Sequence, residues 1–353
     1  MSAPHIWLRA EQRANETRTG LTPQGAATLR DAGFEVSVEA TDSRVIDTQA
    51  YAAAGCTVVA AGSWPDAPKD AVIFGLKELP DDGTPLRHRH IMFGHAYKGQ
   101  TAGQILLRRF KAGCGTLLDL EYLTNGDGRR VAAFGYWAGF AGAAMAIKCW
   151  IAQQDGSICG PVASYPDATA LKADLRADLS SLGTTMPDAL IIGALGRVGA
   201  GAADLCEALG VSVTKWDMEE TAKGGPFPEI LAHALFFNCI LARESTPVFV
   251  PSTAMDQSRN LRVIGDIACD PDSAFNPVPV YDRATSWDAP ALRVHQTPPL
   301  DVMAIDNLPS LLPLESSEDF AAQLLPTLVQ LAQTHADVWS RADTLYHQHS
   351  ATL

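Results

Sequence analysis

The chain has 353 residues, which corresponds to about two domains at roughly 150 residues each. Hydrophobic residues make up 47% of it and charged residues 19%, so the chain can bury a full core and is not of the disordered class. The net charge of −13 repels nucleic-acid phosphates and anionic lipid headgroups, and we expect neither nucleic acid nor a membrane as a partner. A basic pocket for a small anionic substrate is compatible with this charge.

The first 120 residues alternate short apolar strands with helical patterns. Strands are predicted at 6–8, 34–38, 57–60, 71–76, 90–93 and 116–120. Thr22 followed by Pro23 predicts the start of a helix that Gly33 ends, and a shorter helix is predicted at 51–54. This alternation predicts a mostly parallel, doubly wound sheet.

Residues 131–147 carry no charge and are at the short limit for a membrane span. Gly135, Gly139 and Gly142 are spaced along this segment as in a helix-dimer motif. Because no second segment of this kind occurs, we expect a buried helix that packs closely through its glycines.

A second series of strands and helices follows an exposed loop at 155–167 that is rich in Gly, Pro and Ser. Helices are predicted at 171–182 and 202–209, and strands at 189–192, 211–216, 235–240 and 261–264. The chain closes with two helical patterns, 318–333, which Pro326 interrupts, and 336–345. The whole pattern predicts an α/β protein.

A glycine-rich turn follows the predicted strand at 189–192. Gly193, Gly196 and Gly199 stand in a G-x-x-G-x-x-G pattern at the start of a helix, where free backbone N–H groups and the helix dipole favour a pyrophosphate. The next strand ends at Asp217, whose carboxylate can accept hydrogen bonds from both hydroxyls of an adenosine ribose and repels a 2′-phosphate. This arrangement favours NAD over NADP; the alternative is a glycine-rich turn of an unrelated α/β unit.

Charged side chains follow the ends of three predicted N-terminal strands and the loop after the first strand. They are Arg18, Lys77, Glu78, His95, Lys98 and Glu121. Ligands of parallel sheets bind beyond the carboxyl ends of the strands, so we expect these residues to gather there. Such a cluster can bind carboxylates through Arg and Lys, and it can move protons through His and Lys.

Seven cysteines occur at wide spacing, and no C-x-x-C is present. This argues against a disulfide framework and against a zinc site, and His88 with His90 lacks a third ligand, so we expect no metal. Residues 1–10 show no secretory signal, and we expect a cytoplasmic protein with reduced thiols.

A specific combination of segments extends over nearly the whole chain, from about residue 5 to the last helix. The segments are 8–11, 71–78, 95–98, 128–135, 138–142, 190–197, 215–217, 224–227, 238–240 and 305–313. In this combination the chain resembles the NAD-dependent, lysine-forming saccharopine dehydrogenases, which are relatives of the alanine dehydrogenases. The resemblance implies two Rossmann-like domains with an active site in the cleft between them. Residues 1–134 and 311–353 would form the substrate domain, and residues 135–310 the NAD domain.

The resemblance also implies roles for individual residues. Lys77 and His95 match the acid–base pair, and Glu78 and Glu121 match acids that tune its pKa values. Substrate-binding positions are Arg18, Lys77, Lys98 and Phe134. Cofactor-binding positions, with the glycines of the turn, are Arg130, Gly193, Gly196, Arg197, Gly199, Asp217, Thr221, Ile267, Ile305, Asp306, Asn307 and Leu308. Asp306 matches an acid close to the nicotinamide.

The implied reaction is the reversible, NAD-dependent cleavage of L-saccharopine to L-lysine and 2-oxoglutarate, in lysine metabolism, by a monomer or small homo-oligomer. One alternative is an alanine dehydrogenase, against which residues 266–271 argue because they lack a Gln-Gly-Gly continuation. Another is a non-catalytic NAD-binding sensor, which would need none of the proton chemistry of Lys77, His95 and Asp306. The pattern departs from the family at Val198, Leu241, Ala268 and Cys269.

Overall fold

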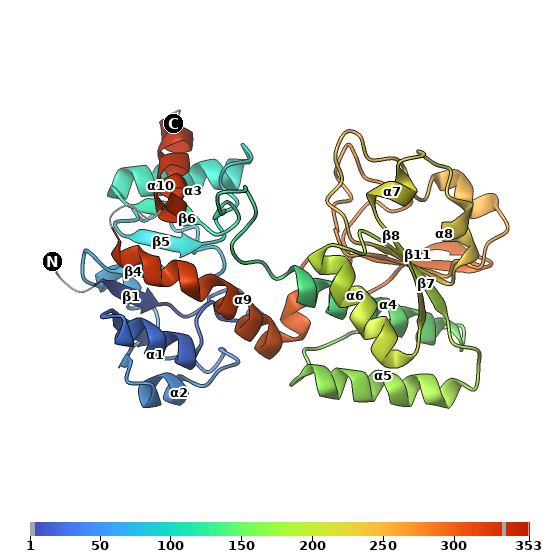
Figure 1. Cartoon of the computed structure of the whole chain (residues 1–353), viewed down its shortest axis with the longest axis horizontal. Helices are drawn as coiled ribbons and strands as arrows, with labels where there is room; N and C mark the ends of the chain where they lie inside the picture. Colours follow the sequence, from blue (N-terminus) through green and yellow to red (C-terminus); the bar gives the residue numbers. More distant parts are fainter. Residues whose placement is uncertain (1–3, 334–336, 352) are drawn as a thin grey trace. The chain divides into compact units, whose positions relative to one another are not determined.

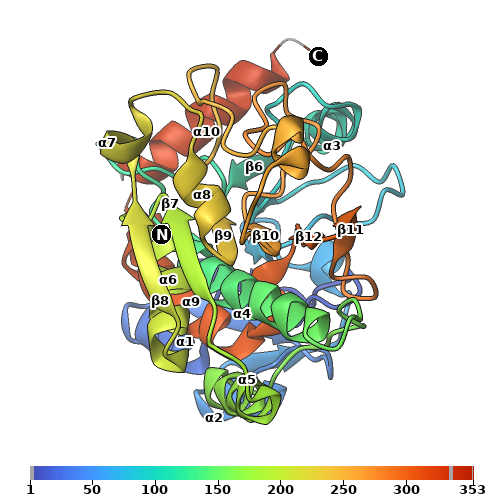
Figure 2. The ribbon, with the colours of Figure 1, turned by 90° about the vertical axis from the view of Figure 1, so that its right-hand side faces the viewer.

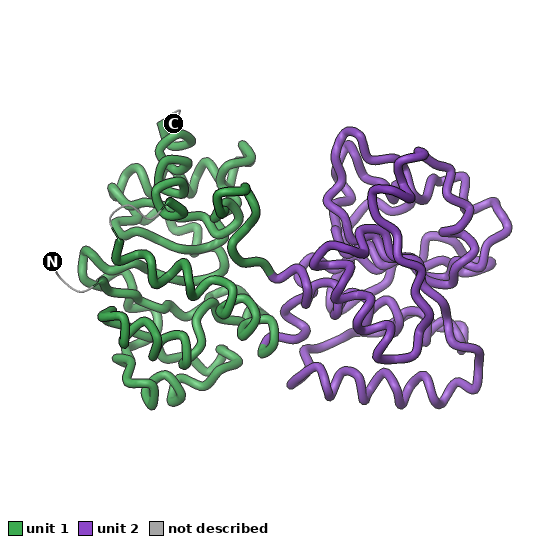
Figure 3. The backbone as a smooth tube through the Cα atoms, viewed as in Figure 1, with its two compact units in different colours: residues 1–133, 314–353 green, residues 134–313 purple. Residues whose placement is uncertain are grey.

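The computed structural model describes residues 4–333, 337–351 and 353, and its elements are labelled in Figure 1. The chain divides into two compact units, coloured separately in Figure 3. The first comprises Met1–Ala133 and Leu314–Leu353, and the second comprises Phe134–Pro313. The predicted α/β class with two parallel-dominated sheets is confirmed.

The first unit is built on a six-stranded sheet of order β3-β2-β1-β4-β5-β6, in which every neighbouring pair is parallel. The strands are β1 (His5–Leu8), β2 (Glu35–Glu39), β3 (Thr57–Val59), β4 (Val72–Phe74), β5 (Arg89–Met92) and β6 (Thr116–Asp119). The helices are α1 (Pro23–Asp31), α2 (Thr48–Ala53), α3 (Thr101–Gly113), α9 (Pro313–Leu328) and α10 (Asp337–Ser350). Residue 336, at which the sequence predicts the last helix to start, lies outside the described residues.

Local sequence explains how these elements begin and why the sheet is buried. The Thr22 hydroxyl accepts the Gly25 N–H at 3.1 Å, and Pro23 occupies the first helical position of α1. The core strands are apolar on both faces, as parallel strands covered by helices require; Ile73, Met92 and Leu117 are fully buried. All carboxyl ends of these strands consequently lie at one edge of the sheet.

The second unit holds a six-stranded sheet of order β11-β12-β10-β9-β7-β8 (Figure 2). The strands are β7 (Asp188–Ile192), β8 (Ser212–Trp216), β9 (Leu235–Asn238), β10 (Val263–Asp266), β11 (Leu292–Gln296) and β12 (Pro299–Met303). Only β11 runs antiparallel to its neighbour. The helices are α4 (Gly135–Gln153), α5 (Ala168–Leu182), α6 (Arg197–Leu209), α7 (Met218–Thr221) and α8 (Pro228–Ala232).

The uncharged segment forms α4, which is buried in the core of the second unit and packs on α6. It starts at Gly135, later than the sequence predicts, and continues to Gln153. A Cβ added at Gly139 would lie 1.8 Å from the Val198 carbonyl oxygen, and one at Gly201 would lie 1.9 Å from the Tyr136 carbonyl oxygen. The two helix backbones therefore touch through glycines, as the sequence predicts. Within the described residues, no helix has the length and apolar character needed to cross a membrane.

We predict that Gly201→Ala destabilises the protein by about 1–3 kcal/mol, because the added methyl group forces the α4 and α6 backbones apart. Alanine is intrinsically the better helix former by about 1 kcal/mol. A net loss of stability in Gly201→Ala would therefore show that the close approach of the two helices outweighs helix propensity. Urea unfolding measures the difference. Gly160→Ala is the control, since no atom beyond its two chain neighbours lies within 4 Å of a Cβ added there. The stability of the protein should change by less than about 0.5 kcal/mol in this variant. An unchanged midpoint in Gly201→Ala would show that the helices separate freely.

Candidate active site

The carboxyl edge of the first sheet brings together the segments that follow β4, β5 and β6. Lys77 lies beyond β4, His95 beyond β5 and Glu121 beyond β6. The parallel pairing continues past the strands, since the Phe93 N–H donates to the Leu76 carbonyl at 3.0 Å. Three of the residues expected at the site therefore leave the same edge of the sheet on neighbouring segments.

His95, Lys98 and Glu121 form one hydrogen-bonded group. His95 Nδ1 lies 2.9 Å from Glu121 Oε2, and Lys98 Nζ donates to Glu121 Oε1 at 2.9 Å. Arg130 Nη2 lies 3.6 Å from the same carboxylate. The hydrogen bond with His95, followed by the one from Lys98, lowers the pKa of Glu121 to about 2 although burial opposes the shift. Glu121 is thus a fixed negative charge that orients the imidazole.

The backbone and the surroundings of His95 also fix its ring. Its φ of 48° is in the left-handed region, which few residues other than glycine adopt. The ring stacks on Phe93, with 6.2 Å between centroids and 18° between planes. The His95 side chain is 51% exposed, so its outer edge is accessible to a substrate.

A second group consists of Lys77, Arg18 and Glu16. Arg18 donates to Glu16 through Nε at 2.8 Å and Nη2 at 2.6 Å, and both side chains are buried, at 3% and 0% exposure. Although burial acts in the other direction, these bonds hold the pKa of Glu16 below its ordinary value. Burial and then the charge of Arg18 lower the pKa of Lys77, and Glu16 partly offsets them. This environment makes the neutral amine of Lys77 easier to reach than in an ordinary lysine.

Sequence reasoning missed Glu16 and assigned the tuning of Lys77 to Glu78. The Glu78 carboxylate is 55% exposed and lies 3.6 Å from Arg13 Nη1, so it is a surface group. It still raises the pKa of Lys77, but it contributes less than the buried Glu16. The Glu-x-Arg spacing of residues 16 and 18 is the signal that points to a bidentate pair.

Lys98, which is expected to bind substrate, and Arg130, which is expected to bind the cofactor, lie in different surroundings from Arg18. Lys98 and Arg130 have side chains that are 54% and 45% exposed, whereas Arg18 is almost completely buried. Phe134 directly precedes α4 and is the first residue of the second unit. Lys98 and Arg130 are therefore the accessible cations of the first unit's group.

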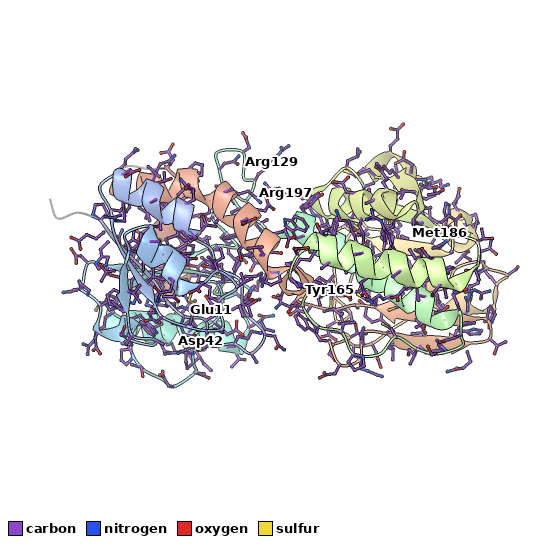
Figure 4. The ribbon with its side chains drawn as sticks, turned by 90° about the horizontal axis from the view of Figure 1, so that it is seen from below. Glu11, Asp42, Arg129, Tyr165, Met186 and Arg197 are labelled. Atoms are coloured by element: carbon purple, nitrogen blue, oxygen red, sulfur yellow. The ribbon has the colours of Figure 1, made fainter. Side chains whose placement is uncertain are left out.

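The glycine-rich turn of the second unit connects β7 to α6. Gly193 has a φ of 87°, and a Cβ at Gly199 would lie 2.2 Å from the Gly193 carbonyl oxygen, so both positions require glycine. Gly196 caps α6 without a side-chain hydrogen bond. Arg197, labelled in Figure 4, is the first helical residue and is exposed. The turn presents the open amino end of a helix, which suits a phosphate group.

Asp217, at the end of β8, has a structural role that the sequence did not indicate. Its Oδ2 accepts the Leu195 N–H at 3.1 Å, and its Oδ1 accepts the Met218 N–H at 2.9 Å. Its own N–H donates to Glu220 Oε2 at 2.7 Å, and the Thr221 hydroxyl donates to its carbonyl at 3.0 Å. Asp217 therefore joins the glycine-rich turn to the start of α7, and Thr221 stabilises that arrangement.

The remaining residues expected on the cofactor side follow β10 and β12. Ile267, Ile305 and Leu308 are buried, Asp306 is exposed, and Asn307 Nδ2 donates to Ser310 Oγ at 2.7 Å. Cys269 Sγ donates to the Ala304 carbonyl at 3.0 Å, which ties the two segments together. Burial, and next the charge of Asp306, raise the pKa of the Cys269 thiol to about 12. Within the described residues, no group of three or more His, Cys, Asp or Glu side chains could hold a metal ion.

Comparison with known proteins gives close relatives over the full length of the chain. Residues 7–141 match the family described as alanine dehydrogenase/PNT, N-terminal domain. A saccharopine dehydrogenase [NAD(+), L-lysine-forming] of Yarrowia lipolytica is 46% identical, over 99% of this chain and 98% of its own. Proteins with the same description are 46% identical in Emericella nidulans, over 100% and 99% of the two chains, and 43% identical in Candida albicans, over 99% and 97%.

Two solved structures share the fold. An L-alanine dehydrogenase superimposes with a TM-score of 0.69 at 18% identity, and covers 98% of this chain and 94% of its own. A transhydrogenase from Sinorhizobium meliloti gives a TM-score of 0.65 at 16% identity, over 96% and 97% of the two chains. At these identities the likeness concerns the fold alone.

Proposed function

Because the chain belongs to the NAD(+)-dependent, L-lysine-forming saccharopine dehydrogenases, we propose that it catalyses the reversible oxidative cleavage of L-saccharopine to L-lysine and 2-oxoglutarate. One observation of the site carries the proposal. A half-buried lysine with a lowered pKa leaves the same sheet edge as a histidine that a carboxylate orients. Such a pair can perform the repeated proton transfers that cleavage of a secondary amine requires.

Lys77 and His95 would divide these proton transfers. Saccharopine must lose a proton from its secondary amine before it is oxidised, and the resulting imine must add water and then release lysine. The lowered pKa of Lys77 makes its Nζ easier to deprotonate than that of an ordinary lysine, and the deprotonated Nζ would accept the proton. The bond between Glu121 and Nδ1 of His95 directs Nε2 toward the substrate as the atom that gives or takes a proton. Bound NAD would supply the hydride acceptor.

The cations of the first unit would bind the three carboxylates of saccharopine. Lys98 is accessible enough to reach the substrate, and Arg130, which matches a cofactor position, is accessible enough to reach the cofactor; both already neutralise Glu121. Arg18 is engaged by Glu16, so we propose that it orders the site and lowers the pKa of Lys77 in addition to any contact with substrate. Phe134 would add an apolar surface for the carbon chain.

The second unit fits a dinucleotide at three places. A Cβ would fill the turn at Gly193 and Gly199, and the N–H groups at the start of α6 would hold the pyrophosphate next to Gly196 and Arg197. Asp217 would bind the ribose hydroxyls and exclude a 2′-phosphate, which favours NAD over NADP. The segment 305–308 and Ile267 would face the nicotinamide end. The seven free cysteines support a location in the reducing cytoplasm.

The function is tested by the absorbance of NADH in the presence of 2-oxoglutarate and lysine, and separately of pyruvate and ammonia. We expect turnover only with the first pair. Lys77→Ala and His95→Ala should each lower kcat by about 10²–10⁴, and the double variant should lose less than the product of the two losses. Lys69→Ala, at an exposed position, is the control. Turnover with pyruvate and ammonia would instead indicate the alanine dehydrogenase alternative.

The pH dependence tests the role of Glu16. Its negative charge stabilises the protonated form of Lys77, so Glu16→Gln should lower the pKa of Lys77 further. Saccharopine oxidation requires neutral Lys77. The acidic limb of the kcat/KM profile should therefore move to lower pH, and Glu78→Gln should move it less in the same direction. A shift to higher pH in Glu16→Gln would contradict this assignment.

The cofactor preference tests Asp217. Asp217→Asn keeps one of the two acceptor oxygens and removes the charge, so NADP should become a usable cofactor at a smaller cost in stability than in Asp217→Ala. Asp217→Ala should also relax the preference, and it should cost about 1–3 kcal/mol of stability because the Leu195 N–H loses its acceptor. KM for NAD and NADP, together with urea unfolding, measures both effects. Equal use of NAD and NADP by the wild type would show that Asp217 does not determine the cofactor preference.

A further inference from the structure

Two residues next to β1 hold the backbone of Lys77 on both sides. Glu11 Oε1 accepts the Leu76 N–H at 2.6 Å, and Glu11 Oε2 accepts the Lys77 N–H at 3.1 Å. Arg9 Nη2 donates to the Lys77 carbonyl, and Arg9 Nη1 lies 3.3 Å from Glu11 Oε2. We propose that Arg9 and Glu11 are positioning residues that fix the catalytic Lys77, an inference that rests on the proposed function.

The segment of Lys77 depends on these bonds because it lies beyond the regular pairing of β4. The last strand bond on this side runs from the Gly75 N–H to the Ile91 carbonyl, at 3.0 Å. The Leu76 carbonyl still accepts a bond from the segment after β5, but the N–H groups of Leu76 and Lys77 go to Glu11 and the Lys77 carbonyl goes to Arg9. Side chains therefore replace the neighbouring strand where the catalytic residue leaves the sheet.

The pair is buried and well seated, which makes it rigid. The side chains of Arg9 and Glu11 are only 1% and 8% exposed. The guanidinium lies against Gly75, where an added Cβ would be 2.3 Å from Arg9 Nε. Arg9 is also anchored by its own N–H, which donates to the Phe74 carbonyl at 2.9 Å. Figure 4 labels Glu11 among the side chains of the first unit. A charged pair with so little exposure is costly unless it is hydrogen-bonded, and here the backbone of Leu76 and Lys77 bonds both Glu11 oxygens and Arg9 Nη2, while the buried Arg9 Nε has no partner among the described residues.

Arg9 and Glu11 should affect the position of Lys77 more than its pKa. The pKa of Lys77 is shifted first by burial and then by the charges of Arg18, Glu16, Arg13 and Glu78. Arg9 and Glu11 together carry no net charge, and their charged atoms face backbone groups of the Lys77 segment. Disturbing this Arg9–Glu11 clamp by Arg9→Lys or Gly75→Ala, which keep both charges, should therefore reduce kcat without moving the acidic limb of the pH profile, unlike loss of Glu16. A displacement of about 1 Å at a reacting group can cost about 10²-fold in rate.

A double-mutant cycle tests the proposal. Glu11→Gln places an NH₂ group against one of the two backbone N–H donors, and we expect kcat to fall about 10–10²-fold with KM for NAD unchanged. In the Lys77→Ala background the same substitution should change kcat less than about twofold, because there is no lysine left to position. Arg9→Lys and Gly75→Ala disturb the clamp from its other side and should behave alike, so the test survives if one variant fails to fold.

The matched control is another buried pair of Arg and carboxylate, formed by Arg293 and Asp301 in the second unit. Arg293 Nε lies 2.7 Å from Asp301 Oδ1, and the two side chains are 18% and 0% exposed. Asp301→Asn should lower Tm as Glu11→Gln does and leave kcat unchanged. Equal losses of kcat from Glu11→Gln in the wild-type and Lys77→Ala backgrounds would overturn the proposal, since the pair would then act on the fold alone.

A measurement without turnover separates this proposal from the proposed function. The labelling rate of Lys77 by a small amine-reactive reagent, read by peptide mass spectrometry, reports the placement and surroundings of its amine. Glu11→Gln should change that rate and Asp301→Asn should not. A changed rate in a protein inactive on saccharopine would support the clamp and contradict the function. If the wild type and Glu11→Gln are both active on saccharopine and Lys77 is labelled at the same rate in both, the positioning role of Arg9 and Glu11 is overturned while the proposed function stands.

Discussion

The parallel pairing of β4, β5 and β6 is the constraint on which the candidate site depends. Parallel strands release their following segments at one edge, and the bond from Phe93 to Leu76 prolongs the pairing beyond the strands. Lys77, His95 and Glu121 are thereby brought to the same edge, although they are far apart in the sequence. The electrostatics follow from this placement, because the pKa values of Lys77 and Glu121 are shifted by their burial and by the polar and charged side chains around them.

The elements of the sheets could be predicted from the sequence because parallel strands are continuous apolar runs bounded by turns. The glycine turn at 193–199 was equally visible, since sterics require its glycines. Helix α3 was not predicted, because its apolar residues are interspersed with charges and its start lacks a capping side chain. The antiparallel pair of β11 and β12 was also missed, since proline and charged residues interrupt its pattern.

The types of residue at the site could be predicted from the sequence, but their hydrogen-bond and ion-pair partners could not. Lys77, His95 and Glu121 were found because they directly follow strands. Glu16 was missed because it lies in an irregular loop, and only the fold shows that its carboxylate is buried against Arg18. The second role of Asp217 was hidden for a similar reason, because its bond to the Leu195 N–H joins segments that follow different strands. The sequence therefore predicts which chemistry is available and leaves open which charge neutralises which.

The left-handed backbone of His95 limits which residues can replace it in related proteins. Asparagine and aspartate tolerate this conformation much better than β-branched residues do, and neither can exchange a proton near neutral pH as imidazole does. The residue at position 95 must therefore meet two requirements, one for the left-handed backbone conformation and one for a side chain that exchanges protons. A descendant that acquired asparagine at position 95 would retain the conformation of the loop and lose the imidazole that exchanges the proton. Asparagine at this position would be a recognisable mark of a lineage that had given up the reaction and kept the fold.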